Sequence, residues 1–108
     1  MTESILILTN CRDSNEADFI MEGLFAEKLV ACVQTNKIHS HYVWNDKIMH
    51  DAEVRLLIKT RKELFSECEK LIRSMHSYEL PEIVEIPITD GSQQFFDWIN
   101  YATKDVEK

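Results

Sequence analysis

The sequence predicts an α+β domain with a ferredoxin-like, split βαβ fold: an antiparallel sheet with two helices on one face, followed by a C-terminal helix. Two observations predict it. Apolar runs and helical patterns follow one another in the order strand, helix, strand, strand, helix, strand, helix. The length of 108 residues, with 44% hydrophobic and 29% charged residues, suits a modest core. Residues 1–108 are therefore predicted to form a single domain.

A change of periodicity marks the first strand and helix. Residues 5–8 form a continuous apolar run of the kind found in central strands. Residues 13–16 then offer helix-capping side chains. Apolar residues follow at helical spacing: Ala17, Ile20, Met21, Leu24 and Phe25.

The middle of the chain predicts a long β-hairpin. Residues 30–44 and 47–59 have extended patterns, and Asn45-Asp46 can form a two-residue turn between them. Each arm has roughly 13 to 15 residues, against about 5 to 6 in a usual strand, so two helices cannot cover it all. The tip carries Tyr42, Val43 and Trp44, which we expect to be covered by self-association.

The second half of the chain predicts two helices around a fourth strand. Thr60 and Glu63 match a capping box, so a helix is expected to start there. Its apolar stripe is Leu64, Cys68, Leu71, Ile72 and Met75. The fourth strand is expected over residues 83–88, with Pro87 at an edge. Ser92 can cap the last helix, whose buried stripe is expected to be Phe95, Trp98, Ile99 and Ala102.

A polar turn, residues 76–83, joins the second helix to the fourth strand. Leu80 precedes Pro81 and is therefore pushed towards extended geometry. The turn gathers an imidazole, a phenol and two carboxylates: His76, Tyr78, Glu79 and Glu82. These side chains either contact a ligand or metal or belong to a solvated connection. Glu53 and Lys59 could reach the same place, although a solvated face is expected for each.

Several segments occur together in one order: Ala31-Cys32-Val33-Gln34, Tyr42-Val43-Trp44-Asn45-Asp46-Lys47, Glu53, Leu57-Ile58-Lys59-Thr60, the turn at 76–83, Pro87 and Trp98. In this combination the chain resembles the CutA divalent-cation-tolerance family over nearly its whole length. Two positions depart from the family pattern. Ser77 stands where the family usually has Pro, and Asp46 stands where it usually has Gly.

The resemblance implies a homotrimer in which the hairpins of neighbouring subunits pair. It places the turn at 76–83 beside a cleft between subunits, where the turn would bind a ligand or metal. Alternatively, Tyr78 and Glu79 would pair across the interface and hold the trimer together. It also implies Cys32 as a candidate copper ligand, with Cys11 of the same or a neighbouring subunit as a second ligand.

The chemistry of the three cysteines differs by position. A thiolate at Cys32 would suit Cu(I), but a small buried residue is the alternative there. Cys11 precedes a helix start, which is expected to lower its thiol pKa. Cys68 lies on the apolar stripe of the second helix and is expected to be packing.

The hairpin histidines form a second candidate metal site, one that the resemblance does not supply. If Asn45-Asp46 is a two-residue turn, His41 lies opposite His50, with Cβ atoms about 4.5 to 5.5 Å apart. His39 is two residues from His41 and points to the same face. Three imidazoles would suit copper or zinc, whereas a bulge or a merely histidine-rich surface would leave no site.

Composition excludes several function classes. The formal net charge of -7 argues against nucleic acid as a partner, and no apolar run of about 18 residues could span a membrane. Three cysteines without disulfide-framework spacing, and no signal peptide, predict a cytoplasmic protein. No catalytic motif is present, so an enzyme is not expected. The expected function is that of a trimer that binds copper or another divalent metal and takes part in the response to metal ions. The alternative is a PII-like signalling trimer with small-molecule sites at subunit clefts.

Overall fold

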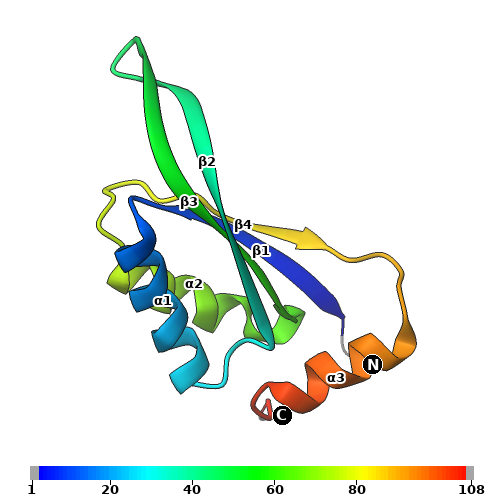
Figure 1. The fold of residues 1–108 in the computed structure, drawn as a ribbon. Helices are drawn as coiled ribbons and strands as arrows, with labels where there is room; N and C mark the ends of the chain where they lie inside the picture. The colour runs from blue at the N-terminus through cyan, green and yellow to red at the C-terminus, as the bar shows by residue number, and fades with distance from the viewer. Residues whose placement is uncertain (1–2, 107–108) are drawn as a thin grey trace.

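The computed structural model describes residues 3–106, which form one four-stranded antiparallel sheet and three helices. In chain order the elements are β1 (Ser4–Cys11), α1 (Ser14–Ala26), β2 (Cys32–Trp44), β3 (Lys47–Arg61), a 3-10 turn (Lys62–Leu64), α2 (Phe65–Met75), β4 (Ile83–Pro87) and α3 (Gln93–Ala102). The strand order is β2-β3-β1-β4, with α1 and α2 against one face of the sheet (Figure 1). The predicted α+β, ferredoxin-like fold is confirmed.

The core lies between α1, α2 and the central strands β1 and β3. β1 and β3 have neighbours on both sides in the sheet, so their apolar side chains are buried most completely. Burying one large aliphatic side chain stabilises a fold by about 1.5–3 kcal/mol. The fully buried aliphatic side chains of this cluster are Ile5, Ile7, Ile20, Leu24, Leu56, Ile58, Leu64 and Ile72.

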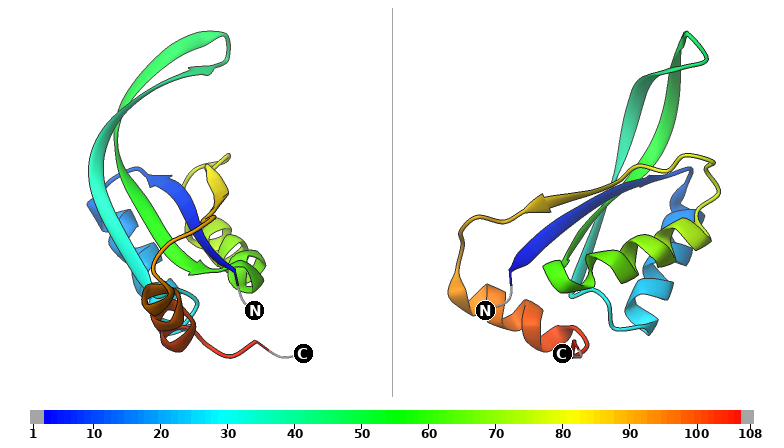
Figure 2. Two further views of the ribbon diagram at one scale, coloured as in Figure 1. Left: turned by 90° about the vertical axis from the view of Figure 1, so that its right-hand side faces the viewer. Right: turned by 180° about the vertical axis from the view of Figure 1, so that it is seen from behind.

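The hairpin of β2 and β3 leaves the sheet as a curved arm (Figure 2). Its strands pair without interruption from Cys32 opposite Lys59 to Trp44 opposite Lys47. Asn45 and Asp46 have φ angles of 52° and 63°, as a type I′ turn requires, so the predicted two-residue turn is confirmed. The arm gives the molecule a longest dimension of 45 Å.

The start of the second helix differs from the prediction. Thr60 belongs to β3, and its hydroxyl donates to the carbonyl of Leu29 at 2.6 Å instead of capping a helix. α2 begins only at Phe65, without a side-chain cap. The capping-box prediction is wrong because β1 pairs with β3 as far as Arg61 and holds this stretch in the sheet.

The helix ends at α1 and α3 match their predicted capping residues. The Asp13 carboxylate accepts from the amide of Glu16 at 2.9 Å, and Ser92 accepts from the amide of Phe95. The predicted buried stripe of α3 is wrong for the single chain. Ile99 is fully buried, but Phe95 and Trp98 remain 39% and 43% exposed, because α3 packs at the end of the sheet farthest from the hairpin tip (Figure 1).

Candidate functional site

A buried histidine, His76, holds the turn after α2 in place. α2 ends at Met75, and His76 is extended at φ -82°, ψ 141°. Its Nε2 lies 2.8 Å from the carbonyl oxygen of Asn10, and its Nδ1 accepts from the amide of Tyr78 at 3.2 Å. A carbonyl only accepts, so Nε2 carries the proton and the imidazole is neutral. The side chain is 0% exposed. His76 thus positions the turn and does not line a cleft, which corrects the expectation that it would contact a ligand.

Cys11, Glu16 and His76 place ligand atoms within 4.8 Å of one another, the one such set of three found among residues 3–106. The oxygens of Glu16 are already engaged, because they accept from the amides of Arg12 and Ser77, each at 2.8 Å. Burial acts to raise the pKa of Glu16, but the hydrogen bonds from Arg12 and Ser77 hold that pKa below its ordinary value. The set is a closed structural network.

The thiol of Cys11 is not activated. Burial, followed by the negative charges of Glu16, Glu53 and Asp13, raises the pKa of Cys11 to about 12. The expectation of a lowered pKa at the helix start is therefore wrong, since desolvation and three carboxylates outweigh the helix end. Cys68 is buried, as predicted, and burial raises its pKa to about 12.

Cys11 and Cys32 of one chain do not come together. Cys11 lies opposite Val54 and Cys32 opposite Lys59, on the two sides of β3. Five positions along a strand separate them by at least about 16 Å. The prediction that both cysteines of one subunit could join in a single copper site is therefore wrong. Cys32 itself is half-buried at the start of β2.

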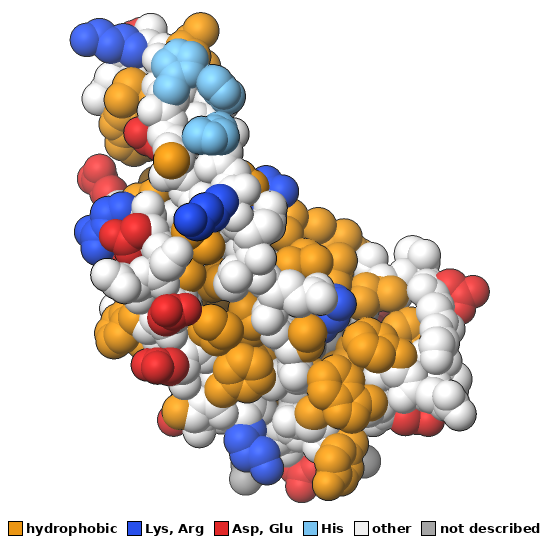
Figure 3. All heavy atoms as spheres, viewed as in Figure 1, with side chains coloured by type: hydrophobic (Ala, Val, Ile, Leu, Met, Phe, Trp, Pro, Cys, Tyr) orange, Lys and Arg blue, Asp and Glu red, His pale blue; other side chains and the backbone are white. Residues whose placement is uncertain are grey.

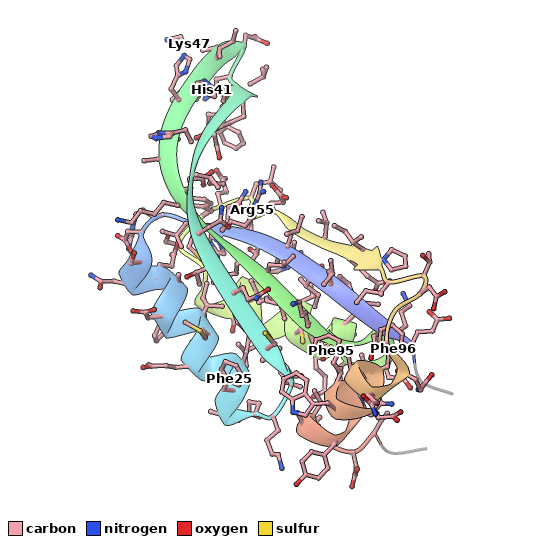
Figure 4. The ribbon with its side chains drawn as sticks, turned by 45° about the vertical axis from the view of Figure 1, so that its right-hand side comes forward. Phe25, His41, Lys47, Arg55, Phe95 and Phe96 are labelled. Carbon is pink, nitrogen blue, oxygen red and sulfur yellow. The ribbon has the colours of Figure 1, made fainter. Side chains whose placement is uncertain are left out.

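A groove of about 980 Å³ lies between the hairpin and the turn at 76–83. Its hairpin side runs along residues 37–44, and the turn contributes Tyr78, Glu79, Leu80 and Glu82. The structure therefore brings three of the four predicted cleft residues to one surface. Arg55 lies where the hairpin leaves the sheet, at the base of this groove (Figure 4).

Tyr78 and Glu53 join the two walls of the groove. The Tyr78 hydroxyl donates to the Glu53 carboxylate at 2.6 Å, and its ring lies 4.8 Å from the ring of His76. Burial, then the hydrogen bond to Glu53 and its charge, raise the pKa of Tyr78. Glu53 is only 9% exposed, so the expected solvated position is wrong.

A second set of side-chain hydrogen bonds holds the other end of the turn. Arg55 donates to the side-chain oxygen of Asn10 at 3.4 Å, and Asn10 donates to Glu82 at 3.1 Å. Glu79 is exposed on the groove. Lys59 lies elsewhere, with its ammonium 5.5 Å from the centre of the Phe95 ring.

The groove has an excess of negative charge. Its lining includes four carboxylates, Asp51, Glu53, Glu79 and Glu82, against two cations, Lys37 and Arg55. The net formal charge of these six groups is therefore -2. A concave surface of this sign raises the local concentration of cations.

The predicted register of the hairpin histidines is confirmed. His41 lies opposite His50, their Nδ1 atoms are 2.6 Å apart, and the rings are nearly perpendicular at 85°. His39, opposite Ala52, shares their face, and imidazoles gather along the arm in Figure 3. His39, His41 and His50 do not place three ring nitrogens within 4.8 Å of one another, whereas Cys11, Glu16 and His76 place their three ligand atoms within that distance. The structure thus provides a close pair with a third imidazole nearby.

The hairpin tip is apolar and open in the single chain. Tyr42 and Trp44 are each 40% exposed and Val43 is 72% exposed, and Ile48 opposite Val43 is 69% exposed. Tyr42 also donates a short hydrogen bond to Asp51. The exposure on which the interface prediction depends is therefore present.

The fold and the groove define a class: ferredoxin-like proteins in which an overlong β-hairpin arm bounds an acidic groove. The chain belongs to the CutA1 divalent ion tolerance protein family, whose model matches residues 5–102. This confirms the resemblance stated from the sequence.

Three relatives illustrate the match. The divalent-cation tolerance protein CutA of Pyrococcus horikoshii is 31% identical over 100 residues, covering 93% of this chain and 98% of that protein. The solved structure of the periplasmic divalent cation tolerance protein CutA from Archaeoglobus fulgidus has a TM-score of 0.91 at 36% identity and covers 94% of this chain and 99% of that one. A chloroplastic CutA of Arabidopsis thaliana is 31% identical, covering 94% of this chain and 56% of that protein.

These names bear on location. Relatives are described as periplasmic and chloroplastic, so a cytoplasmic location for this chain stays a prediction. Within residues 3–106 the helices are too short or too polar to cross a membrane.

Proposed function

We propose that this chain acts by binding rather than catalysis, as a trimeric protein that takes up a divalent cation in its acidic groove and takes part in the response to metal ions. The observation that carries the proposal is the groove's four carboxylates against two cations, in a chain of the divalent ion tolerance family. Asp51, Glu79 and Glu82 are exposed and open to an incoming ion, whereas Glu53 is buried.

The donors favour divalent ions in general, with copper and zinc as candidates. Carboxylate oxygens suit hard cations, and imidazole suits copper and zinc. His39 and His41 contribute to the groove lining, but they alternate with the positions of Asp51 and Glu53 along the ladder, so their imidazoles form a donor set separate from those carboxylates. Cys32 lies outside the groove lining and would constitute a separate thiolate site for Cu(I).

Trimer formation is supported by the open apolar surfaces. Val43, Ile48 and Trp98 keep 72%, 69% and 43% of their area exposed. Removing apolar area from water stabilises an assembly by roughly 25 cal/mol per Å², so covering the arm is favourable.

A small-molecule signalling trimer is the second candidate. The groove volume of about 980 Å³ lies at the upper end of the range for small-molecule sites, roughly 300–1,000 Å³. Trp44 and Leu80 add apolar surface beside the carboxylates, which suits an organic cation.

Metal titration followed by native mass spectrometry, with thiols kept reduced, tests the proposal. We expect the wild-type trimer to take up divalent ions, and Glu79→Gln together with Glu82→Gln to weaken the uptake of Zn(II) and Mn(II). Glu22→Gln, at an exposed carboxylate on α1, is the matched control. Equal uptake by wild type and the groove variant would refute the metal role of the groove, and an organic molecule retained on the purified trimer would support the second candidate.

A further inference from the structure

The structure assigns a second, chemically different metal site to the arm: we propose that His41 and His50 chelate a Cu(II)-type ion through their Nδ1 atoms, with His39 on the same face of the hairpin. This site adds a second place for cation binding, and its role in a metal response rests on the proposed function. Its geometry, however, depends on the hairpin and not on the groove carboxylates.

The pair is already arranged as a chelate. The two Nδ1 atoms are 2.6 Å apart, and they come from directly opposed positions of an uninterrupted ladder. Three residue pairs separate them from a two-residue turn whose φ angles of 52° and 63° fix the register. Little backbone freedom would be lost on binding, because the two strands of the arm are already paired with each other at this point.

The distance between the nitrogens favours a particular coordination geometry. With a metal–nitrogen bond of about 2.05 Å, two ligands at 90° are about 2.9 Å apart, and two tetrahedral ligands are about 3.3 Å apart. The pair must therefore open by about 0.3 Å for a square-planar ion and by about 0.7 Å for a tetrahedral one. Square-planar imidazole sites are typical of Cu(II) and Ni(II), and Cu(II) is bound more tightly.

Binding requires no net loss of protons. At 2.6 Å one Nδ1 donates its N–H to the other, so one ring is the Nδ1–H tautomer and the other the Nε2–H tautomer. When the ion enters, the donor ring passes its Nδ1 proton to solvent and takes one up at Nε2. Both rings stay neutral, and both Nδ1 lone pairs then point at the metal.

The surroundings provide access and charge. Both histidines are exposed, so an ion reaches them without opening the fold, and waters can complete its coordination. His39 lies two residues from His41 on the same face, opposite the small side chain of Ala52. The formal net charge of -7 attracts cations to the whole molecule.

Two measurements on the purified protein test the site. Cu(II) titration gives the affinity, and electron paramagnetic resonance counts the nitrogen ligands. We expect at least two nitrogens in the wild type. We expect His41→Ala with His50→Ala to lose that nitrogen signal and at least about tenfold in Cu(II) affinity, which equals about 1.4 kcal/mol. His41→Gln alone, which keeps a polar side chain on the strand, should also lose one nitrogen.

The controls separate this site from the groove. Lys47→Gln, at an exposed arm position on the opposite face of the hairpin, should leave Cu(II) affinity unchanged. Circular dichroism and light scattering on each variant check that fold and assembly persist. Loss of Cu(II) binding in the histidine variant, but not in Glu79→Gln with Glu82→Gln, supports the arm site.

Unchanged Cu(II) affinity and nitrogen count in His41→Ala with His50→Ala would overturn the arm site and leave the groove proposal standing. Failure of the wild type to bind Cu(II) at all would also overturn it, while Zn(II) and Mn(II) uptake would still decide the groove. Loss of Zn(II) and Mn(II) binding in the groove variant alone, with copper retained, supports both sites independently.

Discussion

Removal of the Tyr78 hydroxyl should destabilise the protein measurably, although the side chain keeps its ring. In Tyr78→Phe the hydrogen bond of 2.6 Å to Glu53 disappears, and a carboxylate that is 9% exposed loses its donor. A hydrogen bond to a charged group contributes about 1.5–3 kcal/mol. Water in the adjoining groove can reach the carboxylate in part, so the lower half of that range, about 1.5–2 kcal/mol, is expected.

Urea unfolding at one fixed protein concentration measures the effect, because the stability of an assembly depends on concentration. The cycle of Tyr78→Phe, Glu53→Gln and their combination isolates the coupling between the two side chains. Tyr101→Phe is the matched control: Tyr101 is 87% exposed, so its change should stay within about 0.5 kcal/mol. A coupling below about 0.5 kcal/mol would refute the claim that this bond joins the arm to the turn.

Three further predictions concern the buried carboxylate, the thiols and the arm. The folded pKa of Glu16 lies below its ordinary value, so the charged carboxylate stabilises the fold above the unfolded pKa of about 4.3, and this stabilisation is lost as pH falls through the folded pKa. Glu16→Gln should therefore have a lower free energy of unfolding at pH 7. Its free energy of unfolding should also depend less on pH below about 4 in acid-unfolding experiments. Alkylation at pH 8 should label Cys32 before Cys11, which has a pKa of about 12 and is fully buried, and mass mapping of native protein that found Cys11 labelled first would contradict this. Trp44→Ser should shift light scattering towards smaller species at micromolar concentration, whereas an unchanged mass would count against the tip as an interface.

Local patterns in the sequence determined most of the fold and one candidate site. The two-residue turn at Asn45 and Asp46 is a local feature, and it alone sets which residues of the arms face each other. The opposition of His41 and His50 could therefore be predicted from the sequence. The polar character of the turn at 76–83 was equally visible, because a proline and its neighbours define it locally.

Only the tertiary structure decided what surrounds each of these groups. Thr60 carries a capping pattern, yet pairing of β1 with β3 keeps it in the sheet. Cys11 precedes a helix, yet burial beside Glu16 and Glu53 raises its pKa. Glu53 became a partner of Tyr78, 25 residues later in the chain, because the sheet brings the two walls of the groove together. Short-range preferences are encoded within a few residues, whereas desolvation and long-range partners depend on how distant segments pack, which no local pattern specifies.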